Sequence, residues 1–177
     1  MSVVQSKRKS TRFEVAHLAF KIRTTLQQTI LIDYGVMENK QLDESTAQLL
    51  RESAPHLVDY AREISNCIQY ANAIYGVDLA MMDERRKWQD HAIANCHCLL
   101  QECQYIIDVF HEYVNVNKYT QITELVHKEI ELLRNWRRSD NKIRRQLVDA
   151  ESDKFNYATF CKYLTIFVDQ FHNQDTA

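Results

Sequence analysis

Glycine and proline are nearly absent from this 177-residue chain, which has two glycines and one proline. Glycine supplies the backbone conformations that tight turns need, and proline ends helices and shapes loops. A β-sandwich or an α/β fold of this length would need many turns and therefore many more of both residues. Long helices joined by few turns would not, so the composition predicts an all-α protein.

Long hydrophobic runs are also missing. No stretch reaches the roughly 18 apolar residues that a membrane-spanning helix needs, and the basic N-terminus has no apolar signal-peptide core. The cysteines are odd in number, which argues against a complete disulfide framework: Cys67, Cys96, Cys98, Cys103 and Cys161. We therefore expect no membrane partner and a reducing, cytoplasmic compartment with free thiols.

Catalytic and metal-binding motifs are absent as well. The two glycines cannot build a phosphate-binding loop or a nucleophile elbow, and the chain has no His-Glu-x-x-His. Cys96, Cys98 and Cys103 suggest zinc, but on a helix Cys98 is rotated by about 200° from Cys96. Cys96 and Cys103 also fall on an apolar seam, where cysteine acts as a small core residue. We expect no metal, no cofactor, no catalytic residues and no enzymatic activity.

Apolar residues recur every three or four positions along four long segments, as they do in packed amphipathic helices. The expected helices are 11–33, ended by Gly35; 44–53 and 54–75, interrupted at Pro55 and ended by Gly76; 82–113; and 117 to at least 138, with a possible continuation to 147. A last helix is expected over 153–172. The pattern predicts an antiparallel up-down four-helix bundle over 11–147. A basic arm at 1–10, interpreted as loose, precedes it, and an additional C-terminal helix or tail follows at 148–177.

The net charge of −2 conceals two basic segments. Residues 1–12 carry +4, from Lys7, Arg8, Lys9 and Arg12. Residues 134–145 carry +5, because Asp140 offsets one charge of Arg134, Arg137, Arg138, Lys142, Arg144 and Arg145. The rest of the chain therefore carries −11. Charge blocks of this kind bear on binding partners more than on the fold.

The segment 134–145 is the strongest candidate for a binding site. Spacings of three and four residues group its cations on one side of a helix, where they suit a phosphate backbone. Trp136 offers an aromatic surface that can stack on an unpaired base. The alternative is a solvated helix end whose cations complement the helix dipole, with Trp136 in the core. The second basic segment favours binding, so we assign both segments to nucleic-acid binding.

Three stretches resemble a known bacterial family. They are the opening Ser-Val-Val-Gln-Ser-Lys-Arg, the block 85–110 and the block 117–145, with Gln89-Asp90 and the run from Trp136 to Lys142 as the most specific parts. They resemble the four-helix-bundle proteins that accompany the reverse transcriptases of diversity-generating retroelements, the accessory variability determinants or Avd proteins. The resemblance covers residues 1–145.

The resemblance implies a non-catalytic accessory subunit that forms a pentameric ring. Such a subunit binds the reverse transcriptase and its template RNA and supports mutagenic retrohoming. The family's basic surface would map onto the cations of 134–145. A helical protein-interaction adaptor, whose basic segment meets an acidic protein and binds no nucleic acid, is the alternative function.

Overall fold

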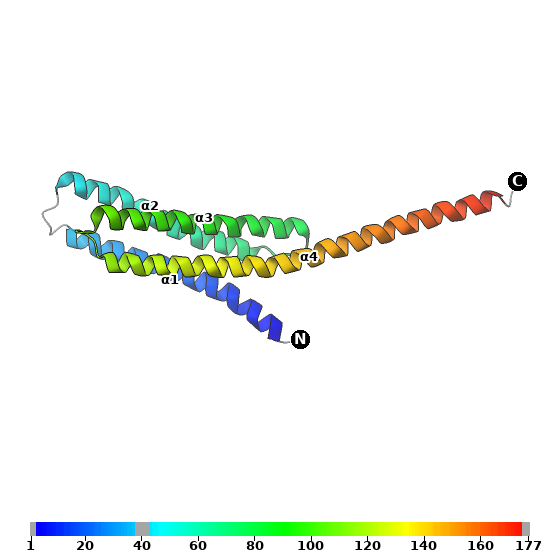
Figure 1. Ribbon diagram of the computed structural model, residues 1–177, viewed down its shortest axis with the longest axis horizontal. Coiled ribbons are helices and arrows are strands. Elements are labelled where there is room, and N and C mark those ends of the chain that lie inside the picture. The colour runs from blue at the N-terminus through cyan, green and yellow to red at the C-terminus, as the bar shows by residue number, and fades with distance from the viewer. Residues whose placement is uncertain (1–2, 38–42, 175–177) are drawn as a thin grey trace. The chain divides into compact units, whose positions relative to one another are not determined.

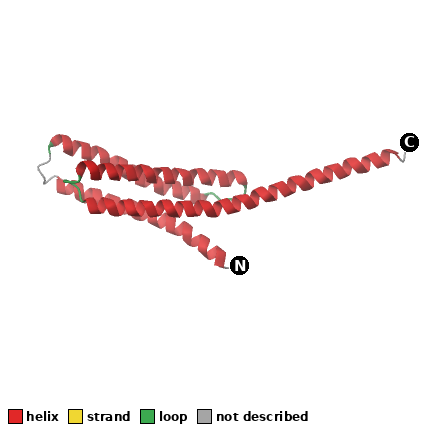
Figure 2. Ribbon diagram, in the orientation of Figure 1, coloured by secondary structure: helices red, strands yellow, loops and turns green. Residues whose placement is uncertain are grey.

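The computed structural model describes the backbone of residues 3–37 and 43–174 and the side chains of residues 14–33, 43–162 and 164. Over these residues the chain is helical and contains no strand (Figure 2). The helices are α1 (Val3–Met37), α2 (Glu44–Ala73), α3 (Leu79–Phe110) and α4 (Val116–Gln174). The predicted all-α class is confirmed. Among the described helices, none is long and apolar enough to cross a membrane.

The chain divides into two compact units, Met1–Arg138 and Ser139–Ala177. In the first unit α1 packs against α2 and α2 against α3, and the first part of α4 runs alongside them (Figure 1). The second unit contains the continuation of α4. We call the helical part of the first unit the bundle and residues 139–174 the extension.

The core of the bundle is one apolar cluster to which all four helices contribute. Each helix supplies a residue at every third or fourth position, as the sequence pattern predicts. The fully buried members include Ile22 and Leu26 of α1, Leu57 and Ile64 of α2, Leu99 and Ile106 of α3, and Ile122, Val126 and Leu133 of α4. Burial of a side chain of this size contributes about 1.5–3 kcal/mol, so the seams hold the bundle together.

Aspartates cap two of the helices. The Asp43 carboxylate accepts the amide of Thr46 at 2.7 Å and begins α2, as predicted. Hydrogen bonds from Ser45 and Thr46 lower the pKa of Asp43 to about 2. Asp78 accepts the amide of Met81 at 2.8 Å and begins α3 at Leu79, three residues before the expected start at 82. An N-terminal carboxylate satisfies an amide that has no acceptor within the helix.

The connection between α2 and α3 differs from the prediction. We expected a break at Pro55, but α2 continues through it, because Leu50 and Leu57 are buried on either side of the proline and hold the helix across it. The helix then ends at Ala73, so Tyr75, expected on the seam, is 78 % exposed. Gly76 does not adopt a positive φ. Instead, a Cβ at this position would collide with the Sδ of Met82.

Both ends of the chain are more helical than expected. Residues 3–10, interpreted as a loose arm, form the first turns of α1, and this helix passes Gly35 to end at Met37. The expected separate helix over 153–172 is the continuation of α4, which runs unbroken from Val116 to Gln174. No glycine or proline occurs between these two residues, so nothing in the local sequence ends the helix.

Candidate nucleic-acid interface

The basic segment 134–145 lies on α4, where spacings of three and four residues determine which cations share a side. In the bundle, Arg134 and Arg138 are exposed and Arg137 is half-buried. In the extension, Lys142 and Arg145 are exposed and Arg144 is half-buried. We call these six residues the basic strip. Four of them therefore present their charge to solvent.

Arg137 is the member of the strip that the bundle holds in place. Its guanidinium donates to the Asp90 carboxylate of α3 at 2.5 Å. The side chains of this ion pair are 30 % and 48 % exposed, so solvent weakens the attraction between them. Asp90 offsets part of the positive charge of the strip and fixes the orientation of one of its cations. Beside it, Arg138 donates to the Asn135 side chain at 3.2 Å.

Trp136 belongs to the core and not to the surface. Its side chain is only 2 % exposed and is part of the apolar cluster that joins the helices. The interpretation of Trp136 as a stacking platform for a base is therefore wrong. The alternative is correct in placing Trp136 in the core, but segment 134–145 is not a helix end, because α4 continues to Gln174. It lies three residues after buried Leu133 on the same apolar stripe, which explains its position.

Arg85 of α3 is buried against Trp136. Its guanidinium carbon lies 5.7 Å from the centroid of the Trp136 ring, which is a cation–π distance. Its Nε donates to the Ala71 carbonyl of α2 at 3.0 Å, and the residue is 2 % exposed. Arg85 thus ties α2, α3 and α4 together. The buried role of Arg85 was not predicted, because an arginine is rarely fully buried.

The two most specific parts of the family resemblance contact one another in this structure. The first is Gln89-Asp90 on α3, and the second is the run that begins at Trp136 on α4. Asp90 pairs with Arg137, and Arg85, one turn before Gln89, contacts Trp136. Gln89 itself is buried. These residues define one end of the bundle, beside the basic strip.

The four basic residues near the N-terminus, Lys7, Arg8, Lys9 and Arg12, lie on the first turns of α1. Their side chains fall outside the described residues. Their assignment to nucleic-acid binding stays a prediction, and they are not part of the basic strip as we define it.

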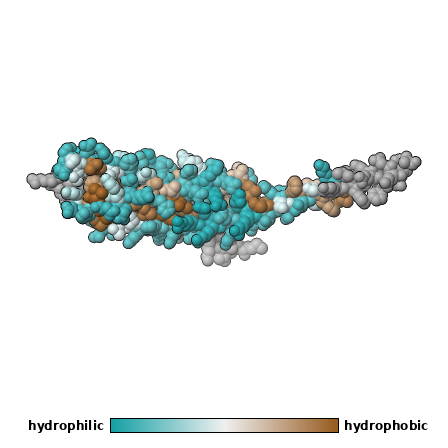
Figure 3. All heavy atoms as spheres, turned by 45° about the horizontal axis from the view of Figure 1, so that its top comes forward, coloured by the Kyte–Doolittle hydropathy of each residue, from teal (hydrophilic) through white to brown (hydrophobic). Residues whose placement is uncertain are grey.

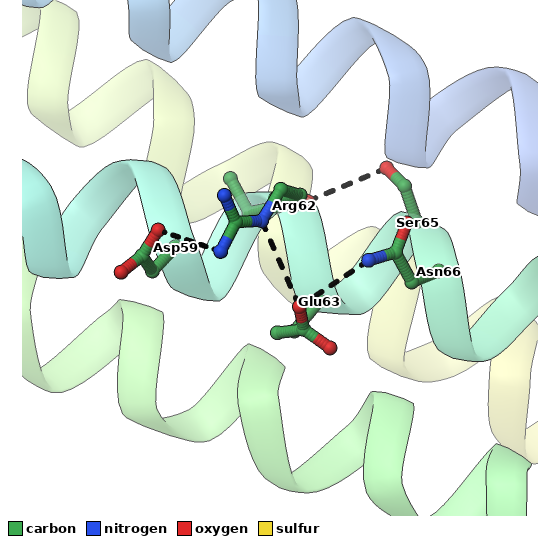
Figure 4. A network of polar contacts seen from close by, with 6 residues as sticks. Asp59, Arg62, Glu63, Ser65 and Asn66 are labelled. Atoms are coloured by element: carbon green, nitrogen blue, oxygen red, sulfur yellow. Dashed lines mark hydrogen bonds and ion pairs between the residues drawn. The ribbon is translucent and has the colours of Figure 1, made fainter.

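Other cations of the bundle have acidic neighbours that offset their charge. Arg62 on α2 lies 3.0 Å from Asp59 and 3.7 Å from Glu63, and Glu63 also accepts from Asn66 at 3.2 Å (Figure 4). Lys87 on α3 lies 3.4 Å from Glu84. Such exposed pairs contribute little to stability, but they leave little net charge to attract an anion. Arg134 and Lys142 of the basic strip have no such acidic partner among the described residues, and this distinguishes the strip from the cations of α2 and α3.

A surface cluster of aromatic rings lies between α2 and α3. The ring centroids of Tyr70 and Trp88 are 4.7 Å apart, and those of Trp88 and His91 are 5.9 Å apart. Trp88 is half-buried, and Tyr70 is 54 % exposed. Around α3, Trp88 and Asp90 are separated by about 200°. The rings therefore lie on the α2 side of α3, away from the Asp90 side that meets the basic strip.

The cysteines of α3 behave as core residues, as expected. Cys96 and Cys103 are fully buried, and Cys98 is half-buried. Burial raises the pKa of Cys103 to about 12 and that of Cys96 well above its ordinary value. Both thiols are neutral at physiological pH and therefore poor nucleophiles and metal ligands. Among the described residues, no three His, Cys, Asp or Glu side chains are grouped to hold a metal ion.

Glu129 is a buried acid that sequence analysis passed over. It is 0 % exposed, and among the described residues neither of its carboxylate oxygens has a hydrogen-bond partner. Burial raises its pKa to about 8, and its carboxyl group contributes to the raised pKa of Cys96. Its helical spacing could have predicted this burial. Glu129 lies three residues after Val126 and four before Leu133, so it occupies a core position of α4.

Glu-x-x-His, a motif of di-iron bundle proteins, occurs at Glu14–His17 and at Glu124–His127. Sequence analysis overlooked both copies. All four side chains are exposed, so neither copy points into the core as a di-iron site requires.

No family model, curated protein or solved structure matches this chain. The basic strip, the buried Arg85–Trp136 pair and the acidic remainder of the chain are therefore the observations on which a function can be built.

Proposed function

We propose that this chain is a non-catalytic accessory subunit that binds a reverse transcriptase and its template RNA. In this role it supports mutagenic retrohoming in a diversity-generating retroelement. The observation that carries the proposal is the basic strip: +5 over residues 134–145 in a chain whose net charge is −2. Its four exposed cations can neutralise phosphates, and the release of counterions then drives binding.

The proposal includes a mode of RNA contact. Because Trp136 is buried, the strip offers cations without a neighbouring stacking ring, which suits the phosphate backbone and not base recognition. Specificity for the template RNA then comes from the reverse transcriptase or from RNA shape. Arg137, oriented by Asp90, is the cation with the least freedom to move.

The finer features of the assembly also belong to the proposal. We take the helices to form an antiparallel up-down bundle, which is supported by the short connections between them and by their opposite directions in Figure 1. The extension is the additional C-terminal helical segment. A homo-oligomeric, pentameric ring and a cytoplasmic location follow from the family resemblance and the free thiols.

RNA binding at increasing salt tests the proposal. Four phosphate contacts on single-stranded RNA give a slope of about −3 in log affinity against log salt, which is about fiftyfold weaker binding at 200 mM than at 50 mM. The triple variant Arg137→Glu, Arg138→Glu, Lys142→Glu should abolish binding. The matched control Arg51→Glu, Arg62→Glu, Lys87→Glu makes the same change in net charge on α2 and α3 and should retain most of it.

Equal losses of RNA affinity in the two triple variants would show that binding depends on the net charge of the chain and not on the basic strip. A chain that retains no RNA but forms a stable complex with a protein partner would favour the adaptor function. Retention of the reverse transcriptase by the wild-type chain in a pull-down, with and without ribonuclease, separates direct protein contact from a shared RNA.

A further inference from the structure

The extension carries the same apolar stripe that the bundle buries. On α4 the buried positions Ile122, Val126, Glu129, Leu133 and Trp136 alternate in steps of four and three residues. The same spacing continues beyond the bundle through Ile143, Leu147, Ala150, Tyr157, Cys161 and Leu164, with the charged residues Asp140 and Lys154 at two of its positions. A seven-residue repeat kept over this length is typical of a helix that packs against another helix along its whole course.

The stripe of the extension is least covered in its C-terminal part: Asp140 is buried and Ile143 and Leu147 are half-buried, whereas Ala150, Lys154, Tyr157 and Leu164 are exposed. Tyr157 is 71 % exposed and Leu164 is 46 % exposed. Phe160, which flanks the stripe, is 61 % exposed, and Figure 3 shows hydrophobic atoms on the surface of this segment. At about 200 Å² for each ring, Tyr157 and Phe160 leave about 260 Å² uncovered. This is about a third of what one partner contributes to a standard protein interface.

We propose that the extension is a dimerisation element: it pairs with the extension of a second copy of this chain in an antiparallel two-stranded coiled coil. In the register that we infer, Lys154 lies opposite Tyr157 of the second copy. Ala150 then lies opposite Cys161, and Leu147 opposite Leu164, and each pair occurs twice because of the two-fold symmetry. We call each of these facing pairs a layer of the coiled coil; each layer joins a stripe position of one copy to a stripe position of the other.

The charges of the extension favour this arrangement over a parallel one. A parallel pair would place Lys154 on the stripe beside its own copy, with like charges adjacent. The antiparallel pair places the Lys154 ammonium against a tyrosine ring, which attracts a cation.

Light scattering on the full chain tests the pairing. Leu164→Asp should halve the molecular mass, because it places a carboxylate in two layers of the coiled coil. This result holds whether the wild-type particle is a dimer of single chains or of larger rings. Leu49→Asp, at a comparably exposed leucine of α2, is the matched control and should leave the mass unchanged. An unchanged mass in Leu164→Asp would overturn the proposal.

A cross-link tests the register independently of any loss of stability. Ala150→Cys should give a covalent dimer on treatment with diamide, through residue 150 of one copy and Cys161 of the other. Peptide mapping identifies the linked pair, and Cys161→Ser in the same background should abolish it. A dimer of the wild-type chain linked through Cys161 of both copies would show a parallel pair and overturn the antiparallel register. Because dimerisation does not depend on RNA, its failure would leave the proposed function intact.

Discussion

One stripe of α4 passes through two regions of the molecule that treat it in opposite ways. In the bundle, Ile122 and Leu133 are fully buried by the neighbouring helices, whereas in the extension Tyr157 is 71 % exposed. Both regions share the same spacing, and both are helical. The spacing therefore determines which face of a helix packs, but it does not determine what covers that face. The covering helices come from this chain in the bundle, and by our proposal from a second copy in the extension.

The pH dependence of stability should set the two regions apart most strongly. The pKa of Glu129 is raised from 4.5 to about 8 in the folded chain, so between these values the folded chain keeps a proton that the unfolded chain has lost. The free energy of unfolding should therefore fall by about 1.4 kcal/mol per pH unit, or about 5 kcal/mol in total, as pH rises through this window. Urea unfolding measured from pH 4.5 to 9 checks this.

Glu129→Gln should remove most of that pH dependence and make the bundle more stable above pH 8. Glu151→Gln, at an exposed position of the extension, is the matched control and should leave the curve unchanged. A wild-type stability that is flat between pH 5 and 8 would contradict the buried, unpartnered state of Glu129.

Truncation of stripe residues should give the next largest difference in unfolding free energy between the bundle and the extension. Trp136→Ala removes a buried ring from the core and its contact with Arg85, and should cost about 3–5 kcal/mol. Tyr157→Ala, on the same stripe, should change the unfolding free energy of the bundle by less than about 0.5 kcal/mol. Chemical denaturation followed by circular dichroism compares the two, and similar losses would show that the extension folds as part of the bundle core.

Disruption of the close contact at the turn between α2 and α3 should cause an intermediate loss of stability. Gly76→Ala places a methyl group against the Sδ of buried Met82 and should cost about 1–3 kcal/mol. Met82→Ala combined with Gly76→Ala should cost less than the sum of the single changes, because it removes the colliding atoms. Ser152→Ala in the extension has no such neighbour to displace and should be neutral. Thermal unfolding gives all four values, and strict additivity would contradict the contact.

The smallest effect should come from the ion pair at the end of the bundle. Arg137→Ala should destabilise the bundle by less than about 1 kcal/mol, because both members of its pair with Asp90 are partly exposed. Arg145→Ala in the extension should be neutral. The difference between them should shrink further in 1 M salt, where charges are screened over about 3 Å. A loss that is independent of salt would show that Arg137 acts through packing and not through charge.

The sequence is most informative where a regular pattern decides the structure. The spacing of apolar residues predicted the helices, and α2 begins at residue 44 as predicted, directly after its cap Asp43. The pattern fails where a single residue is overruled by packing. Pro55 normally ends a helix, but buried leucines on both sides hold α2 together. Glu129 was passed over because an acid is rarely buried, although its spacing placed it in the core.

The basic strip could be predicted only in part. Charge counting located it, and helical spacing grouped its members. The position of Trp136 depended on α3, since Arg85 and the Asp90–Arg137 pair determine how that end of the bundle closes, and such contacts between distant segments cannot be read from local spacing. The continuity of α4 was missed for a different reason. The residues around 147–153 are polar enough to suggest a connection, although none of them breaks a helix.

Pro55 makes the first turns of α2 a separate unit of opening. Because proline donates no amide proton, the carbonyl of Arg51 lacks its usual helical donor, and among the residues before Pro55 in α2 only Leu50 and Ser53 are buried. A recess of about 290 Å³ lies here between α2 and α3, lined by Leu49, His56 and Tyr105 among others. Amide protons of residues 44–54 should therefore exchange with deuterium through local fraying of the helix. Amide protons of residues 57–73 should exchange only when the whole bundle unfolds.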